Sequence, residues 1–503
     1  MTTNKDSKKL GYLYKLLWPI HKNEIKLVLP IGLMMFCVLF NLGVMKSLKD
    51  SLIVTSIGAE AISFIKLYVV LPIALIFTAI YFKLSNIMSL NNIFVLITSC
   101  FIGFFIIFAY VIFPYQDFYH FSPDFINDAT LSLPHLKWPI KILSKWSYVI
   151  TYVLAELWSS IVVNLLFWQL ANQIINSEQA TRLYLFLAMI GNLGLIMAGA
   201  CLKSFSYAEF FPEIITSKFT LTSGHELELT LKLLTIVLVF STMLTVCLLQ
   251  YLVLFTKHRN NKLSLKEEST KTKLSFKESI RVILNSHYIL NIALIVICYS
   301  LAINIIEGAW KAKLQSLFYT TEYLNFMGNF NIATGITCVI FTFIGTVILQ
   351  KFGWRWAASI SPMTLAISGS LFFVASIIAR YYDNDETLIF CAIIIGSLQN
   401  IFSKAAKYSI FDATKEMAYI PLSIELKSKG KAAVEVVGSK LGKSCGSVLQ
   451  SGIFILFPMV TFDSIIPFLF SIFIVIISVW IYALNALSKK YNELLLREKN
   501  NIV

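Results

Sequence analysis

Apolar residues come in runs of about twenty along most of the chain, separated by polar stretches rich in lysine. A helix of that length crosses the roughly 30 Å hydrocarbon core of a bilayer. The runs predict these membrane-spanning helices: Leu27–Met45, Phe64–Phe82, Ile93–Phe113, Trp146–Leu170, Leu183–Leu202, Leu233–Phe255, Ile289–Ile306, Ile332–Leu349, Ala357–Ile378, Leu388–Phe402, Val434–Val460 and Ile465–Leu484. About twelve helices and no strand signal predict an all-α membrane protein.

A basic polar stretch divides the predicted helices into two sets of equal size. This linker covers residues 256–288 and separates an N-terminal half, 27–255, from a C-terminal half, 289–487. Residues 1–26 precede the first half, and residues 488–503 form a basic tail. Two equal six-helix halves are typical of transporters that bind substrate between internal repeats.

The distribution of charge predicts the orientation in the membrane. The 503 residues are 57% hydrophobic, and 42 Lys and Arg against 28 Asp and Glu give a net charge of +14. Cytoplasmic loops of membrane proteins collect Lys and Arg. The basic residues gather before the first span, in the 256–286 linker, at Lys351 and Arg355, in residues 404–431 and in the tail, while the opposite loops are balanced or acidic. Both termini are therefore expected on the cytoplasmic side of a cell inner membrane.

Several classes of function are disfavoured by missing motifs. The basic charge is accounted for by topology, and no Cys/His finger or aromatic-basic motif indicates nucleic acid. The eight cysteines show no metal-ligand or redox spacing, so neither a metal nor a cofactor is expected. Residues 438–444, GSKLGKS, resemble a phosphate-binding loop, but they have three residues between the glycines instead of four and no strand before them. We expect no enzyme.

Charged residues within the N-terminal spans are the first candidates for a site. A charge at membrane depth costs about 2.5–3.5 kcal/mol on insertion scales, so it usually faces a cavity, a partner or a ligand. Lys46 and Lys49 share a helical face at the end of the first run, where snorkelling to the interface is the alternative. Glu156 lies ten residues into the fourth span, with Asn164 further along. A structural salt bridge is the alternative for Glu156.

In the C-terminal half, the seventh and tenth apolar runs lead directly into charged residues. Glu307 and Lys311 are four residues apart, so they can also pair with each other. Trp310 between them is a candidate for base stacking, although an interfacial tryptophan is the commoner reading. Lys404 and Lys407 lie close to one helical face.

A second pair of lysines lies at the start of the eleventh span. Lys440 and Lys443 stand beside glycines at four-residue spacing, which let helices approach closely in lipid. Together, the lysines of the two halves predict one site for a polyanion between them.

Five stretches that contain these residues closely resemble one family. They are LKDSLIVTSIGAE, AELWSSIVVNLLFWQLANQI, INIIEGAWKAKL, SKAAKYSIFDATKEMAYIPL and KGKAAVEVVGSKLGKS. They resemble the non-mitochondrial nucleotide transporters, the ATP/ADP translocases of plastids and obligate intracellular bacteria. The resemblance implies a twelve-helix, major-facilitator-like exchanger. It also implies that Lys49, Glu156, Glu307 and Lys443 bind and couple nucleotides. Departures at Cys445 and at residues 159–160 leave the base preference open.

The resemblance predicts an antiporter that takes external ATP in exchange for internal ADP, functional as a monomer in a lipid bilayer. Exchange or import of other ribonucleotides, such as GTP, CTP or UTP, is one alternative. A proton-coupled carrier of a smaller organic anion, with Glu156 as the proton site, is another. A membrane scaffold without transport activity would not explain charges inside four separate spans.

Overall fold

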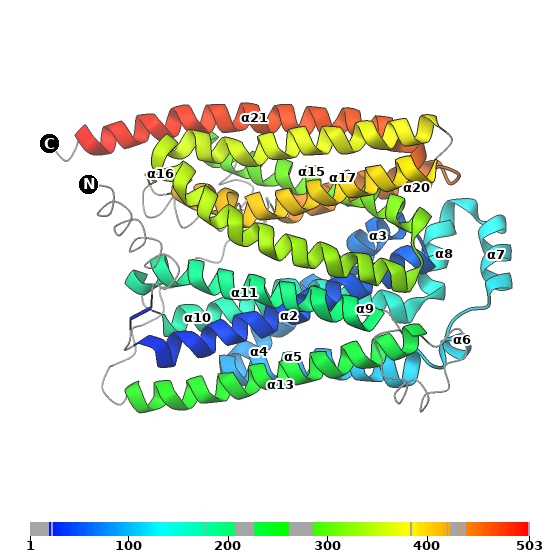
Figure 1. Ribbon diagram of the computed structural model, residues 1–503, viewed down its shortest axis with the longest axis horizontal. Helices are drawn as coiled ribbons and strands as arrows, with labels where there is room; N and C mark the ends of the chain where they lie inside the picture. Colours follow the sequence, from blue (N-terminus) through cyan, green and yellow to red (C-terminus); the bar gives the residue numbers. More distant parts are fainter. Residues whose placement is uncertain are drawn as a thin grey trace, which may run out of the picture.

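A computed structural model describes residues 20–21, 24–175, 177–206, 226–260, 284, 286–382, 385–419, 421–422, 434 and 439–500. In these ranges the regular structure is helical, in two bundles that lie one above the other in Figure 1. The linker residues 261–283 and the N-terminal residues 1–19 lie outside the described ranges.

The N-terminal bundle contains the lower helices in Figure 1. Its long elements are α2 (Ile25–Ser56), α3 (Ala61–Phe64) continued by η2 (Ile65–Val70) and α4 (Leu71–Ile87), α5 (Leu90–Ile107) with η3 (Phe108–Ile112), α9 (Trp146–Leu157) with η5 (Trp158–Phe167) and α10 (Trp168–Ile174), α11 (Ser177–Ser206) and α13 (Glu226–Asn260). The short elements α6 (Gln116–Tyr119), α7 (Pro123–Ser132), η4 (Pro134–Leu136) and α8 (Lys137–Ser144) connect η3 to α9.

The C-terminal bundle contains the upper helices. They are α15 (His287–Leu317), α16 (Thr320–Tyr381), α17 (Glu386–Ala406) continued by η7 (Lys407–Phe411) and α18 (Asp412–Ala418), α20 (Ser439–Leu456) and α21 (Phe462–Asn500). The long α16 bends at Gly353, which has a φ of 78° that suits a residue without a Cβ. Two spans, Thr320–Leu349 and Lys351–Tyr381, therefore follow each other with little connection.

Ten of the described helices are long and apolar enough to cross a membrane. Two shorter apolar helices, Ala61–Phe77 and Ser444–Leu456, fall where the second and eleventh spans are expected. The all-α membrane fold predicted from the hydrophobic pattern is confirmed, while the count of twelve spans stays a prediction.

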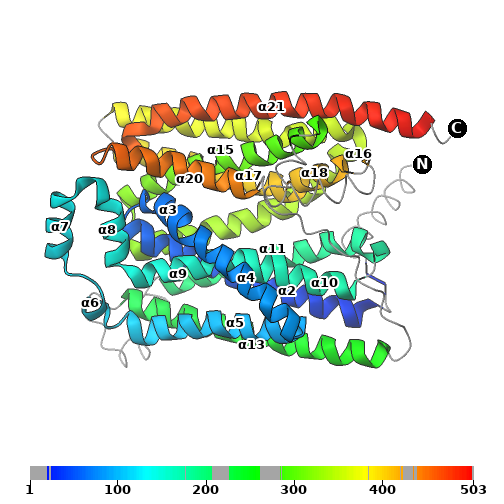
Figure 2. The same cartoon turned by 180° about the vertical axis from the view of Figure 1, so that it is seen from behind.

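The two bundles pack closely along α11 and α16. A Cβ on Gly199 of α11 would lie 2.4 Å from the carbonyl oxygen of Gly328 of α16. No side chain fits there, so the glycines allow the backbones to touch. Figure 2 shows a second contact region, where α3 lies beside α20 near α7 and α8.

Polar contacts also join the bundles at the end of the molecule where α2 terminates. The hydroxyls of Thr55 and Thr320 lie 2.7 Å apart. The backbone N–H of Ala59 donates to the side chain of Gln315 at 3.0 Å. The N–H of Phe462, which begins α21, donates to the Glu60 carboxylate at 3.2 Å. This end, opposite in Figure 1 to the C-terminal end of α21, is held together by both bundles.

The connection from α6 to α8 covers the same end. The ring of Trp138 on α8 packs against Phe454 of α20, with 6.3 Å between the ring centroids. His135 Nδ1 lies 2.8 Å from the carbonyl oxygen of Ile455. The connection therefore adds contacts between the bundles outside the spanning helices.

Candidate functional site

Asp50 is the centre of a chain of ion pairs between the bundles. Its Oδ1 lies 2.8 Å from the ammonium of Lys49, the preceding residue of α2. Its Oδ2 lies 2.9 Å from the ammonium of Lys311 on α15. Lys49 also pairs with Glu156 of α9 at 2.9 Å. One carboxylate thus connects a lysine of each half.

The chain of ion pairs continues through Glu307 on α15. Its carboxylate lies 3.4 Å from Lys311, one helical turn away, and 3.9 Å from Lys66 of η2. The N-terminal bundle therefore meets the C-terminal bundle twice, at Asp50–Lys311 and at Lys66–Glu307. Three ammonium groups and three carboxylates balance in charge. We call these six residues (Lys49, Asp50, Lys66, Glu156, Glu307 and Lys311) the ion-pair network.

Most of the ion-pair network is shielded from solvent. The side chains of Lys49 and Lys311 are each 2% exposed, and that of Asp50 is 7% exposed. Glu156 and Glu307 are more open, at 23% and 25%. Taking one charge out of water costs several kcal/mol, so each buried charge needs an opposite partner. A polyanion that enters on the side of the two glutamates would compete with them for the lysines.

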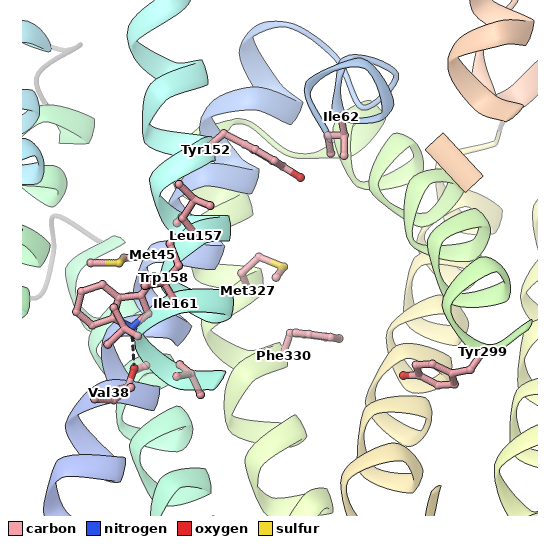
Figure 3. Packing of buried hydrophobic residues seen from close by; sticks show 14 of the residues in the cluster. Val38, Met45, Ile62, Tyr152, Leu157, Trp158, Ile161, Tyr299, Met327 and Phe330 are labelled. Atoms are coloured by element: carbon pink, nitrogen blue, oxygen red, sulfur yellow. Dashed lines mark hydrogen bonds between the residues drawn. The ribbon is translucent and has the colours of Figure 1, made fainter. Parts of the chain in front are cut away.

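An aromatic face completes the surroundings of Lys49. Its ammonium lies 3.7 Å from the centroid of the Tyr152 ring, a cation–π contact. Tyr152 stands one helical turn before Glu156 on α9, so both contact the same lysine. Figure 3 shows Tyr152 pointing away from α9 toward the space between the helices, where Met327 and Phe330 of α16 also point.

Lys404 lies in the field of Glu307, Lys311 and Asp50, and both Lys404 and Lys407 contact aromatic rings. The Lys404 ammonium is 4.6 Å from the Phe330 centroid. That of Lys407 is 5.4 Å from Tyr299 and 5.1 Å from Tyr408. The helix changes to the wider η7 at Lys407, and such π-helical turns are frequent at functional sites.

The charge of Lys46 acts on Lys404 across the boundary between the bundles. Lys46 itself is half-buried, one turn before Lys49 on α2. It adds a further cation of the N-terminal bundle to the basic region around the network.

The remaining sequence candidates are placed less favourably. Trp310 is 1% exposed, and its indole N–H donates to the carbonyl of Ile393 at 3.1 Å. In this conformation it packs inside the C-terminal bundle and does not face an open path. Asn164 is exposed on η5 and has no part in the ion-pair network. Lys440 and Lys443 belong to α20, but their side chains lie outside the described part of the chain.

Three residues of the site were missed as candidates from the sequence. Lys66 lies inside the second predicted span, and the criterion that selected Glu156 would have selected it as well. Asp50 was visible only as the neighbour of Lys49, because a Lys-Asp pair at the end of a span resembles an interfacial charge. Tyr152 carries no sequence signal, since an aromatic residue in a span is ordinary.

The described side chains of the site are better suited to binding an anion than to catalysing a reaction. In the part of the chain that the structure describes, no group of His, Cys, Asp and Glu could hold a metal ion. The network holds acceptors and donors that can exchange partners, and it joins two bundles at a place where relative movement would break it. These are the properties of a binding site coupled to conformation.

Solved structures with the same architecture are transporters. The chain aligns with a bacterial homologue of the iron transporter ferroportin over 92% of its length and 100% of that chain, with 16% identity and a TM-score of 0.53. It aligns with the nucleoside transporter NupG over 91% of its length and 98% of that chain, with 12% identity and a TM-score of 0.53. The likeness confirms the major-facilitator-like fold.

Sequence relatives cover nearly the whole chain. ADP,ATP carrier protein 3 of Rickettsia bellii is 47% identical over 490 residues, covering 95% of this chain and 97% of that protein. ADP,ATP carrier protein 1 of Rickettsia prowazekii is 40% identical over 501 residues, covering 98% and 99%. The family model described as TLC ATP/ADP transporter matches residues 3–491. A multi-pass membrane protein with this match along its length belongs to the TLC ATP/ADP transporter family.

Proposed function

We propose that this protein exchanges external ATP for internal ADP by alternating access between its two bundles. The observation that carries the proposal is the position of Asp50, which holds Lys49 of one bundle and Lys311 of the other. The names of the Rickettsia relatives and of the family supply the substrate class.

In the proposed mechanism the phosphates replace the carboxylates as partners of the lysines. A nucleoside polyphosphate carries several negative charges, and it must exchange its hydration for cations that are already in place. Glu156 and Glu307 are the more open carboxylates of the network, so the phosphates would displace them first from Lys49 and Lys311. The remaining Asp50 bridge would then be the link that opens.

The same pairs explain why exchange would be coupled. In the empty site two ion pairs, Asp50–Lys311 and Lys66–Glu307, join the bundles, so movement of the bundles would take Lys66 from its carboxylate and Lys311 from one of its two. A bound nucleotide would keep the lysines paired while the bundles move. The empty protein would thus resist switching, and a counter-substrate would be required for the return.

The orientation follows from the charge of the loops. With both termini in the cytoplasm of a cell inner membrane, the end held by Thr55–Thr320 and Glu60–Phe462 would face outside. The described conformation would then be closed to the exterior. One chain contains both halves of the path, which supports transport by a monomer.

Labelled-nucleotide uptake into proteoliposomes tests the proposal. Vesicles with the full-length protein and internal ADP should take up external ATP, and vesicles without internal nucleotide should take up little. Parallel uptake of GTP, CTP and UTP measures base preference. Uptake that follows a pH gradient and ignores internal nucleotide would overturn the proposal in favour of a proton-coupled carrier.

A further inference from the structure

Two buried tyrosine hydroxyls lie next to the ion-pair network without a hydrogen-bond partner. Tyr152 on α9 and Tyr323 near the start of α16 are each 0% exposed. Neither hydroxyl has a hydrogen-bond partner among the described residues. Buried polar atoms in folded proteins nearly always form hydrogen bonds. Two buried hydroxyls without a partner beside one site therefore need an explanation.

Both hydroxyls are in the field of the same charges. Asp50, Lys311 and Glu307 act electrostatically on each of them, from opposite bundles. The ring of Tyr152 carries the Lys49 ammonium on its face, and Figure 3 shows its hydroxyl end pointing away from α9 toward the neighbouring helices. The two phenols thus approach the network from one bundle each.

The lysines explain why the phenols lack acceptors in this conformation. Asp50 uses one oxygen for Lys49 and the other for Lys311. Oε1 of Glu156 is engaged by Lys49, and Glu307 is shared by Lys311 and Lys66. The carboxylates close to the phenols are therefore committed to stronger, charged donors.

We propose that Tyr152 and Tyr323 are substrate-binding residues, whose hydroxyls donate to phosphate oxygens of a nucleoside polyphosphate held between Lys49 and Lys311. This inference rests on the proposed function and identifies which part of the substrate the two phenols contact. Phosphate oxygens only accept hydrogen bonds, and a phenol offers a donor without adding charge. One phenol belongs to each bundle. A phosphate can therefore accept hydrogen bonds from both only when the bundles are closed around it.

Conservative removal of the hydroxyls separates binding from structure. Tyr152→Phe and Tyr323→Phe keep the ring and remove a group that has no partner in the empty protein. The melting temperature of the empty variants should therefore stay at or above the wild-type value. Their Kd for ATP, measured by calorimetry on the full-length protein in detergent, should rise about tenfold each, as expected for one lost hydrogen bond to a charged acceptor.

Tyr148, one turn earlier on α9, provides the matched control. Its hydroxyl donates to the side chain of Gln116, so it already has a structural partner. Tyr148→Phe should lower the melting temperature of the empty protein and leave the Kd for ATP unchanged.

The outcomes distinguish this inference from the proposed function. If the wild-type protein binds ATP and both phenylalanine variants bind it equally well, the inference is overturned and the proposed function stands. If the variants lose stability when empty, as Tyr148→Phe should, the phenols are structural and the inference is again overturned. If the wild-type protein itself binds no nucleotide, the proposed function fails and the inference with it.

Discussion

Asp50 of α2 lies 2.9 Å from Lys311 of α15, so the two bundles are joined by a carboxylate that also holds Lys49 at 2.8 Å. The two lysines share one small anion in a buried setting. A larger anion with more acceptor oxygens can pair with both lysines at once, so that they no longer have to share one carboxylate. The relationship makes Asp50 the residue whose loss should affect both stability and switching.

Asp50→Asn should destabilise the described conformation strongly. Removing one partner of a buried ion pair typically costs about 3–5 kcal/mol, because the remaining charge stays buried. Lys49 keeps Glu156 and Lys311 keeps Glu307, so we expect the lower part of that range. Denaturation of the purified protein in detergent measures the loss.

A double-mutant cycle with Lys311→Gln tests whether the two residues act as a pair. Asp50→Asn combined with Lys311→Gln should cost less than the sum of the single changes, with a coupling of about 0.5–3 kcal/mol. Additive losses would show that the bridge contributes nothing to stability.

Lys404→Met should impair transport without destabilising the protein. Among the described residues no carboxylate forms an ion pair with Lys404, whose ammonium lies over Phe330. Removal of a half-buried cation without an ion-pair partner should leave the melting temperature unchanged or higher. Loss of one charged donor to phosphate should reduce ATP uptake about tenfold or more.

Lys313→Met is the matched control for this change. Lys313 is also a C-terminal lysine, but its fully buried ammonium pairs with Asp463 at 2.9 Å. Its loss should lower the melting temperature, while ATP uptake per folded protein changes little. The assignment of Lys404 to the substrate path would be wrong if the two variants behaved alike.

Locking the end where α2 terminates should stop exchange. The hydroxyls of Thr55 and Thr320 are 2.7 Å apart, so cysteines at both positions place two sulfurs within bonding reach. Oxidation of the Thr55→Cys, Thr320→Cys protein should reduce ADP-dependent ATP uptake more than tenfold. A reducing agent should restore it. The single-cysteine variants serve as controls, and undiminished uptake by the cross-linked protein would contradict alternating access at this end.

Glu60→Gln should change how stability depends on pH. Burial raises the pKa of the Glu60 carboxyl above its ordinary 4.5, and Asp463 adds to the rise, while the Phe462 N–H and Lys137 oppose it. The folded protein therefore binds this proton more tightly than the unfolded chain. Its stability falls as pH rises from 4.5 through the raised pKa, and the penalty is constant above that window.

The glutamine variant lacks this penalty and keeps an oxygen for Phe462. Its melting temperature should match the wild type near pH 4 and exceed it at pH 7. His120, whose pKa is lowered to about 4 mainly by burial, responds in the opposite direction, but it is common to both proteins and cancels in the difference. If the difference in melting temperature between the variant and the wild type did not change with pH, the prediction would be wrong.

The hydrophobic pattern determined the class of fold because lipid allows few solutions. Within a bilayer the backbone N–H and C=O groups of a single segment must form hydrogen bonds with each other. Apolar runs of span length therefore become helices, independently of how the neighbouring segments pack. The same reasoning selected Lys49, Glu156, Glu307 and Lys311, because a charge at membrane depth is expensive wherever the helix packs. These four residues meet in one network.

Partner choice, by contrast, was decided by the tertiary structure. Whether Glu307 pairs only with Lys311 or also with Lys66 depends on where η2 lies relative to α15, and no spacing along the chain encodes that position. The role of Asp50 and the unpaired hydroxyls of Tyr152 and Tyr323 arise in the same way. The free energy of a buried charge or hydroxyl depends on its burial and on its distance to groups from other segments. Both quantities exist only once the two bundles have packed.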